Sequence, residues 1–420
     1  MNEYFHASNP WWRNSTFDTS IPRQDYTDKL LKNFDQQLIQ IITGLRRVGK
    51  STIVRQLIQR LITEKCIDPH RIFWFSAEER IIENIPLSSI INEFRAFFEI
   101  ESSEQIIVCI DEVQFRPTWV QEIKSLYDIE NTKFILTGSS ALLLSEHTDL
   151  LTGRFLKTVV YPLNFKEFLE FTGKTLDPTN PARNAKRADN YLKTGGMPEY
   201  VLRKPENYLQ TTVESILFRD LVTSYKIRSP FMLGKMLALF ADRVGTRSSS
   251  PKLARILEVS KDAVLDYTTY MEMVFLTSRL PIFSSSRNEQ IYNADKIYFE
   301  DVGVLHTFSR KFNQGAAAEN AVVNHLHRNV LQDIRTIIGY WWKDGKEIDF
   351  VVHEQGKTHA IEVKQVDYIE DLTTHQLEYA LKYVKFDSIT IVTRKLEGEV
   401  HLKGHQATLV PLYKFLLNEK

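Results

Sequence analysis

The chain has 420 residues, of which 43% are hydrophobic and 25% are charged. A chain of this length exceeds one ordinary core, so we expect two to three domains of globular composition. Lys and Arg together number 53, as do Asp and Glu. The balance excludes a chain that is basic throughout, so any surface that contacts nucleic acid has to be local.

Cysteine use and hydropathy bear on the compartment. Cys66 and Cys109 are the two cysteines, too few for a disulfide framework, and Cys109 lies in an apolar run. Both features fit a reducing compartment. The polar N-terminus has no apolar signal core, and no apolar run approaches the ~20 residues of a membrane span. We therefore expect a cytoplasmic protein with no membrane partner.

The first domain is expected over residues 1–175. After a lead-in that ends at residue 36, short apolar runs alternate with amphipathic helical segments such as Thr52–Glu64. Such runs suit strands that are buried on both faces of a parallel sheet, so the alternation predicts an α/β domain. The expected strands are Ile39–Thr43, Arg71–Ser76, Gln105–Asp111, Lys133–Thr137 and Phe155–Tyr161.

The segment after the first expected strand reads Gly-Leu-Arg-Arg-Val-Gly-Lys-Ser and fits the pattern G-x-x-x-x-G-K-[ST]. A strand precedes it and a helix follows it, as phosphate binding by the loop amides and the helix N-terminus requires. Lys50 would reach the β- and γ-phosphates, and the Ser51 hydroxyl would ligate Mg²⁺. The sequence therefore predicts ATP and Mg²⁺ as ligands of a P-loop whose binding residues are Gly44, Arg47, Val48, Gly49, Lys50, Ser51 and Thr52.

A second acidic feature supports the same site. The apolar run QIIVCIDE ends in Asp111 and Glu112. A P-loop ATPase needs a carboxylate at the end of a neighbouring strand to hold Mg²⁺, and a second carboxylate can polarise the attacking water. We assign the first role to Asp111 and the catalytic role to Glu112.

With these features the chain resembles the AAA+ ATPase superfamily. The resemblance implies a polar γ-phosphate sensor at the end of the next strand, where KFILTGSS offers both Thr137 and Ser139. It also implies an arginine finger just before the fifth strand, and Arg154 stands there. Such a finger acts on a neighbouring subunit, so the resemblance implies a homo-oligomer, of which a hexameric ring is one form. The alternative for Arg154 is an ordinary surface arginine in an ion pair.

The middle of the chain is expected to be helical. Residues 176–227 predict a helical lid, interrupted at Gly195-Gly196-Met197-Pro198, and residues 228–285 predict a winged-helix-like module. There Pro251 would open one helix, Ser260 would cap the next, and Ile256 would face inward. The second helix carries mostly acidic side chains, so we expect a spacer or a weak binder of the DNA backbone rather than a reader of base sequence.

Residues 286–420 are expected to form an α+β domain with a hairpin between Ile337 and Gln365. A two-residue turn at Gln355-Gly356 fixes the register and places Asp349 opposite Glu362, and Glu347 opposite Lys364. Alternation then puts Asp349, Glu362 and Lys364 on one face. Opposed Cβ atoms lie about 4.5–5.5 Å apart, so two carboxylates could share a divalent cation. The alternative is an exposed hairpin with cross-strand ion pairs.

Asp349 followed by Glu362-Val363-Lys364 resembles the motif of PD-(D/E)xK nucleases, which have a restriction-endonuclease-like fold. The resemblance adds Glu319 on an earlier helix and implies a second Mg²⁺ or Mn²⁺ held by Glu319, Asp349 and Glu362. It gives Lys364 the catalytic role of positioning water or stabilising phosphate charge. Some members of this nuclease family also have a glutamine and a tyrosine on the next helix. Gln376 and Tyr379 occur here, at a spacing that matches imperfectly.

The whole chain resembles prokaryotic AAA-family ATPases that carry an uncharacterised C-terminal domain. The phrases that carry this resemblance are GLRRVGKST, IDEVQ, LTGSSALLL, LTGR, TGGMPEY, KIYFEDVG and IEVK. Two functions remain open: an ATP-driven enzyme that processes DNA through the C-terminal domain, and a nucleotide-switched regulatory ATPase whose nuclease-like domain binds a partner. Stimulation of ATP turnover by DNA would separate them.

Overall fold

A computed structural model describes residues 3–14, 16–138, 148–222, 227, 229–284, 286–329 and 335–418. The chain divides into two compact units, Met1–Tyr161 and Pro162–Lys420. The first unit therefore ends earlier than the expected boundary at residue 175. Among the described residues, no helix has the length and apolar character that a membrane crossing needs.

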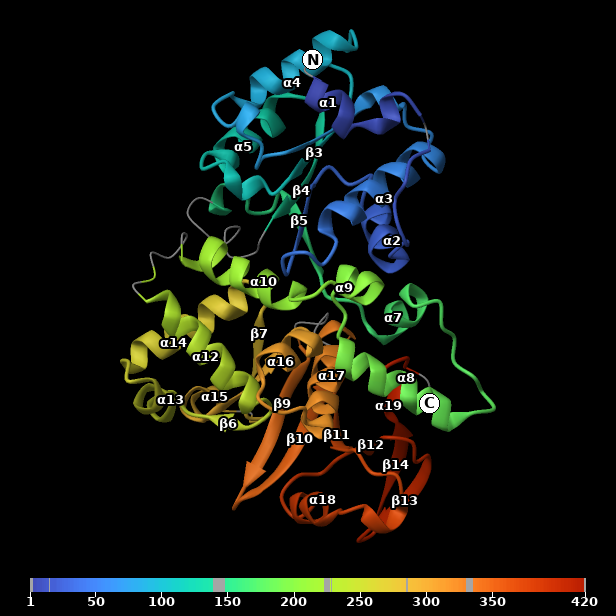
Figure 1. The fold of residues 1–420 in the computed structure, drawn as a ribbon, viewed down its shortest axis with the longest axis vertical. Coiled ribbons are helices and arrows are strands. Elements are labelled where there is room, and N and C mark those ends of the chain that lie inside the picture. Colours follow the sequence, from blue (N-terminus) through green and yellow to red (C-terminus); the bar gives the residue numbers. More distant parts are fainter. Residues whose placement is uncertain are drawn as a thin grey trace. The chain divides into compact units, whose positions relative to one another are not determined.

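The first unit is built on a five-stranded parallel sheet in the order β2-β3-β4-β1-β5 (Figure 1). Its strands fall on the five expected apolar runs: β1 Ile39–Gly44, β2 Ile72–Ser76, β3 Ile106–Asp111, β4 Thr132–Gly138 and β5 Phe155–Val160. Strands β1 to β4 are buried along almost their whole length. Parallel strands are joined by crossover helices, and such helices cover the faces of the sheet. The helices are α1 Glu3–Ser8, α2 Gln24–Lys32, α3 Lys50–Thr63, α4 Leu87–Phe97 and α5 Trp119–Ile129.

The N-terminal lead-in belongs to this sheet. The indole N–H groups of Trp11 and Trp12 both donate to the Ile72 carbonyl, at 3.0 and 2.9 Å. The Asn9 side chain accepts from the Trp74 amide and donates to the Trp74 carbonyl. These contacts satisfy backbone groups of β2, which is an edge strand, so the lead-in covers an edge that would otherwise offer free pairing sites.

The second unit begins with helices and a small sheet. The helices are α7 Phe165–Phe171, α8 Pro181–Thr194, α9 Pro198–Arg203, α10 Tyr208–Ser215, α12 Pro230–Asp242, α13 Ser250–Leu257 and α14 Lys261–Met273, with a π-helical segment at Ile216–Val222. Strands β6 Arg247–Ser248, β8 Asp295–Phe299 and β7 Thr277–Leu280 pair antiparallel in that order.

The central strand of this small sheet, β8, lies outside residues 228–285, the range expected for a winged-helix-like module. Within the module, the Ser260 hydroxyl accepts from the Ala263 amide and caps α14 as expected. The expected inward position of Ile256 is wrong. Its side chain is 48% exposed, whereas Leu253 and Leu257 of the same helix are buried.

The remainder is a six-stranded mixed sheet in the order β13-β14-β12-β11-β10-β9 (Figure 1). Its strands are β9 Ile337–Lys343, β10 Lys346–Glu354, β11 Lys357–Lys364, β12 Ser388–Thr393, β13 Gly398–Leu402 and β14 His405–Pro411. The helices are α15 Arg287–Tyr292, α16 Val302–Phe308, α17 Gln314–Asn329, α18 His375–Ala380 and α19 Leu412–Phe415. Leu377 and Ala380 of α18 pack into the apolar core over this sheet.

The β10–β11 hairpin has the expected register. Glu354 pairs with Lys357 and Phe350 with Ile361. Gln355 and Gly356 have φ values of 50° and 76°, the left-handed pair that a two-residue hairpin turn requires. The register between β10 and β9 shifts between Ile348 and Val351, a β-bulge that the alternation rule did not anticipate.

Candidate functional site

The P-loop joins β1 to α3, and its shape depends on two glycines. Gly44 has a φ of 147°, and a Cβ there would lie 2.1 Å from the Val160 carbonyl oxygen of β5. Gly49 has a φ of 94° and stands immediately before α3. Because L side chains rarely adopt these conformations, the glycines allow the loop to turn and the helix to begin at Lys50.

The groups expected to hold nucleotide and metal meet beyond the carboxyl ends of the strands. The Ser51 hydroxyl lies 2.9 and 2.7 Å from the two carboxylate oxygens of Asp111. The Lys50 ammonium lies 4.0 Å from a carboxylate oxygen of Glu112 and donates to the Gly44 carbonyl. The structure therefore brings together the P-loop residues Lys50 and Ser51 and the two carboxylates of Asp111 and Glu112, to which the sequence analysis assigned metal binding and catalysis.

Burial shapes the electrostatics at Asp111. Its side chain is 7% exposed, and burial raises its pKa, while hydrogen bonds from Thr137 and Ser51 act in the opposite direction. A buried carboxylate needs a compensating cation or hydrogen-bond donors. The oxygen atoms of Asp111 and Ser51 are the ligand type that Mg²⁺ prefers, so these residues fit the expected metal.

The structure describes one of the two sensor candidates, Thr137. Thr137 Oγ1 donates to Asp111 Oδ1 and accepts from the Glu112 amide at 3.0 Å. Its hydroxyl thus fixes both carboxylate residues in place. Ser139 lies outside the described residues, so only Thr137 has a described position.

Glu112 has a φ of 50°, an uncommon conformation for a residue with a side chain. Gln114 donates to its carboxylate. A Cβ at Gly138 would lie 2.5 Å from Gln114 Oε1, so the glycine gives that amide room. The Thr137 and Gln114 contacts hold Glu112 over the P-loop lysine.

Arg154 lies at the other edge of the sheet. It precedes β5, whose first residue, Phe155, pairs with Ile39, whereas Val160 at the far end pairs with Gly44. Five residues separate these two pairs along the strands. At ~3.3 Å per residue, the end of the sheet that holds Arg154 lies roughly 17 Å from the end that holds the P-loop. The guanidinium instead lies 3.5 Å from Asp128 and is 38% exposed. Arg154 therefore does not reach the nucleotide site of its own chain.

Arg23 is a residue that sequence reasoning missed. It is 4% exposed, and its guanidinium donates to the carbonyls of Val48 and Tyr161, both at 2.9 Å. This arginine thereby ties the P-loop to the end of β5. An arginine in a lead-in gives no local signal of such a contact, because its partners lie 25 and 138 residues away.

In the second unit, the acidic residues of the hairpin surround a buried lysine. Lys296 of β8 is fully buried, with its Nζ atom 3.0 Å from Glu319 Oε1, 2.6 Å from Glu347 Oε1 and 3.8 Å from Asp349 Oδ1. Tyr298, two residues on, donates to the same Glu319 oxygen at 2.6 Å. The segment KIYFEDVG, for which the sequence analysis predicted no chemistry, therefore supplies the centre of this cluster.

Glu362 stands beside a different lysine. Its carboxylate lies 2.7 Å from Lys364 Nζ, and its other oxygen accepts from the Asp349 amide at 3.2 Å. Asp349 Oδ2 accepts in turn from the Val363 amide at 2.8 Å. With its amide nitrogen turned toward the acceptors, Gln376 donates to Glu362 Oε1 at 3.0 Å. Tyr379 instead donates to Asp344.

The structure bears on two expectations about this cluster. The paired residues of β10 and β11 end at Phe350 and Ile361, so the placing of Glu347 opposite Lys364 stays a prediction. The carboxylate of Glu347 pairs with Lys296, whereas Lys364 pairs with Glu362. Within the described part of the chain, no three His, Cys, Asp or Glu side chains lie so as to hold a metal ion. The set Glu319, Asp349 and Glu362 therefore does not fit a shared Mg²⁺ or Mn²⁺, because lysine ammonium groups already neutralise its members.

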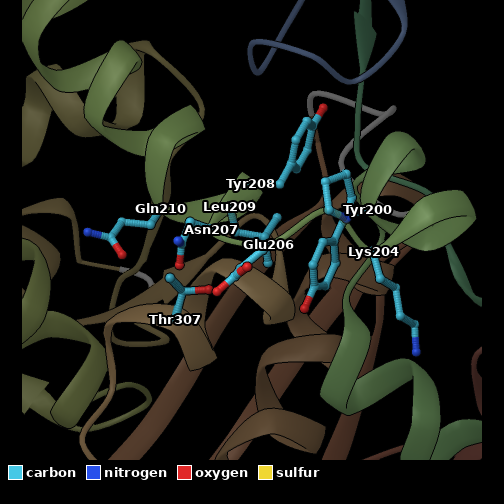
Figure 2. A pocket seen from close by; sticks show the side chains of 9 residues that line it. Tyr200, Lys204, Glu206, Asn207, Tyr208, Leu209, Gln210 and Thr307 are labelled. Atoms are coloured by element: carbon cyan, nitrogen blue, oxygen red, sulfur yellow. The ribbon is translucent and has the colours of Figure 1, made fainter.

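One hollow in the described part of the second unit has polar and charged lining residues. This hollow, of about 320 Å³, lies at the α9–α10 connection. Figure 2 shows Glu206 beside Thr307, whereas Lys204 and Gln210 point away from them. Because its charged groups do not converge, we assign no ligand to this hollow.

Comparison with known families agrees with the first site. Residues 36–169 match the family model of the AAA domain. This segment is similar to AAA domains. It contains the P-loop, Asp111, Glu112 and Thr137. Residues 185–315 and 314–415 match two families that are each described as a domain of unknown function.

Relatives extend over nearly the whole chain. An uncharacterized protein of Methanocaldococcus jannaschii is 28% identical over 94% of this chain and 91% of its own length. One of Haemophilus influenzae is 26% identical over 93% of this chain and 97% of its own. Both relatives match the segment that resembles an AAA domain together with most of the chain after it. Their names state no activity, so they indicate no function for this chain.

Two solved structures show weaker likenesses. The Aeropyrum pernix ORC1 protein in complex with DNA is 13% identical, with a TM-score of 0.32 over 73% of this chain and 96% of that one. AMPPCP-bound DnaA from Aquifex aeolicus is 16% identical, with a TM-score of 0.31 over 63% and 92%. Likenesses at this level carry no argument about what this chain binds.

Proposed function

We propose that the AAA domain binds ATP with Mg²⁺ and hydrolyses it. The observation that carries this proposal is the meeting of Ser51, Asp111 and Thr137 beside Lys50 and Glu112. These groups stand at the N-terminus of α3, where backbone N–H groups and the helix dipole favour phosphate. Residues Gly44 to Thr52 would enclose the phosphates.

Each side chain has a defined task in this proposal. Lys50 would turn from the loop carbonyls to the β- and γ-phosphates, and Ser51 with Asp111 would hold Mg²⁺, which supplies positive charge against the phosphate oxygens. Glu112 would orient a water and accept its proton as the oxygen attacks the γ-phosphorus. The bond from that phosphorus to the bridging oxygen then breaks, and ADP leaves with that oxygen.

Two variants test this proposal together. Lys50→Ala should abolish or greatly weaken ATP binding, because it removes the charge that faces the phosphates. Glu112→Gln should retain ATP binding and lower kcat by about 10²–10⁴-fold, the range for a lost general base. Calorimetry with ATP and a phosphate-release assay measure both. Unchanged affinity in folded Lys50→Ala, together with unchanged turnover in Glu112→Gln, would refute the assignment.

We further propose that the chain acts as a homo-oligomer in which Arg154 serves a neighbouring site. Arg154 is separated from its own P-loop by the length of the sheet, so a direct role in hydrolysis requires another subunit. A ring of subunits would place each arginine near the next nucleotide. The competing role of Arg154 is the surface ion pair with Asp128.

DNA processing is the second candidate function. The helix pair α13–α14 and the β6-β8-β7 sheet fit a winged-helix-like module, and a hollow of about 600 Å³ beside it is lined by Lys261, Arg279 and the exposed Tyr292. Positive and aromatic side chains of this kind suit a nucleic-acid backbone and bases. The PD-(D/E)xK resemblance would add cleavage by the centre that contains Asp349, Glu362 and Lys364.

No cleavage step through a metal follows from the described arrangement, because the carboxylates are paired with Lys296 and Lys364. This observation favours the alternative, a nucleotide-switched ATPase whose C-terminal domain binds a partner. ATP turnover measured with single-stranded, duplex and forked DNA, alongside cleavage of each with Mg²⁺ or Mn²⁺, separates the two. Stimulated turnover supports DNA processing, and turnover that ignores every DNA supports the regulatory alternative.

A further inference from the structure

Lys296 has surroundings unlike those of an ordinary lysine. Its side chain is fully buried, and its ammonium also lies 5.7 Å from the centre of the Tyr340 ring. Burial alone would lower the pKa of Lys296, but attraction to Glu319, Asp349 and Glu347 raises it above its usual value. The side chain is therefore a permanent cation inside the protein.

The carboxylates around Lys296 come from elements that are distant in the chain. Glu319 lies on α17, whereas Glu347 and Asp349 lie on β10. Carboxylates that are brought together in a buried place repel one another unless a cation or shared protons compensate them. Lys296 supplies this cation from β8, so one strand of the small sheet neutralises groups from two other elements.

The position of the ammonium decides what else can bind. Its nitrogen lies 2.6–3.0 Å from oxygens of Glu347 and Glu319. A Mg²⁺ ion bridging such carboxylates would have to stand about 2.0–2.1 Å from each ligand oxygen, in the same space. The ammonium and the ion therefore cannot occupy this space together.

Lys296 also lies on a strand that its neighbours hold in place. The backbone of its strand is paired on both sides, with β6 and with β7. The Phe299 amide of the same strand donates to the Asn320 side chain at 2.8 Å, and Asn320 donates back to the Phe299 carbonyl. These bonds hold the backbone of β8 against α17, next to Glu319, and the Lys296 side chain is fully buried there.

We propose that Lys296 is a built-in counter-ion that closes the acidic centre of the C-terminal domain to divalent cations. The centre is held together by a lysine where the nuclease resemblance implies a metal. Removal of this one positive charge, with the carboxylates left in place, converts the centre into a divalent-cation site. The inference concerns metal binding alone and stands whether or not the AAA domain hydrolyses ATP.

Mn²⁺ binding to the full chain without nucleotide tests this proposal, with free ion counted by electron paramagnetic resonance. Wild type and Asp349→Asn should bind equal amounts, because the wild-type centre has no place for the ion. Any binding at the P-loop is common to both and cancels. Lys296→Met should bind an additional ion, and Mn²⁺ should raise the Tm of this variant but not that of wild type.

Two controls make the gain specific. In Lys296→Met/Asp349→Asn the additional ion should be lost, because a ligand is gone. Lys364→Met also removes a lysine of this cluster, but the ammonium of Lys364 pairs with Glu362, which forms no ion pair with Lys296. This control should gain no ion. An equal gain in Lys364→Met would show a general effect of lost positive charge and overturn the proposal.

Two further results would also overturn it. The first is wild type binding more Mn²⁺ than Asp349→Asn, which would show that Lys296 does not exclude the ion. The second is folded Lys296→Met gaining no ion and no rise in Tm. If Lys296→Met fails to fold even with Mn²⁺, Lys296→Met/Glu347→Gln replaces it, because one uncompensated carboxylate is then removed while Glu319 and Asp349 remain as ligands.

Discussion

Replacing Thr137 with valine removes one hydroxyl from the AAA site without changing the shape of the side chain. That hydroxyl donates to Asp111 and accepts from the Glu112 amide. Thr137→Val leaves this amide without its partner, and an unsatisfied buried group costs about 1–3 kcal/mol. Glu112 holds a left-handed conformation that costs about 1–2 kcal/mol for a residue with a Cβ. The two costs are similar, so the backbone of Glu112 is expected to relax.

The consequence of this relaxation is kinetic. A displacement of about 1 Å at a catalytic group can lower the rate by about 10²-fold. We therefore expect Thr137→Val to lower kcat by roughly 10–100-fold while ATP affinity changes little, since Lys50 and the loop amides are untouched. Phosphate release at saturating ATP gives kcat, and titration with a fluorescent nucleotide gives the affinity.

Thr137→Ser is the matched control, because it keeps the hydroxyl and loses only a methyl group. It should turn over ATP at close to the wild-type rate. If Thr137→Val has the wild-type kcat, the hydroxyl does not position Glu112. If Thr137→Ser is as slow as Thr137→Val, the methyl group and not the hydroxyl matters, and the reasoning is refuted as well.

Two further predictions concern assembly and pH. If Arg154 acts in trans, Arg154→Ala should lower kcat by ~10³-fold or more with ATP affinity kept, and mixing it with Glu112→Gln subunits should restore some activity; exchange of subunits without any recovery would contradict this role. In the wild-type protein, burial and then the charge of Asp349 raise the pKa of Glu319 to about 7, while Lys296 acts in the opposite direction. The Lys296→Met variant loses this opposing charge. When the pKa of a carboxyl group is higher in the folded than in the unfolded protein, the group stabilises the fold fully at pH values below its unfolded pKa of about 4.3. That stabilisation is lost as the pH rises through the folded pKa. The stability deficit of Lys296→Met in urea should therefore be larger above pH 7 than near about pH 5, and a deficit independent of pH would argue against uncompensated carboxylates.

The parts of the molecule that the sequence predicted follow from short-range rules. The P-loop needs only a strand, a glycine-rich turn and a helix in succession, and Gly44 to Ser51 lie in that order. The β10–β11 register needs only the two-residue turn at Gln355-Gly356, which fixes every pair beyond it. In both cases the partners are close in the chain, so their spacing determines the geometry.

Other features escaped these rules for two different reasons. The bulge between Ile348 and Val351 faces β9, which is close in the chain, but a turn rule does not count an extra residue within a strand. The partner of Glu347 became Lys296, 51 residues away, on a strand of another sheet. A sequence shows which carboxylates can gather but not which cation packs among them, so a metal was expected where a lysine stands.

Strand β8 and the residues after it connect two features of the second unit. Lys296 and Tyr298 of β8 both contact Glu319 in the acidic centre. Asp301, two residues past the end of β8, accepts from the Gly196 amide at 2.5 Å. Because a strand is stiff along its length, a shift of β8 that withdrew the lysine would also strain the hydrogen bond to Gly196. This bond therefore links the segment KIYFEDVG to the segment TGGMPEY, at the turn between α8 and α9.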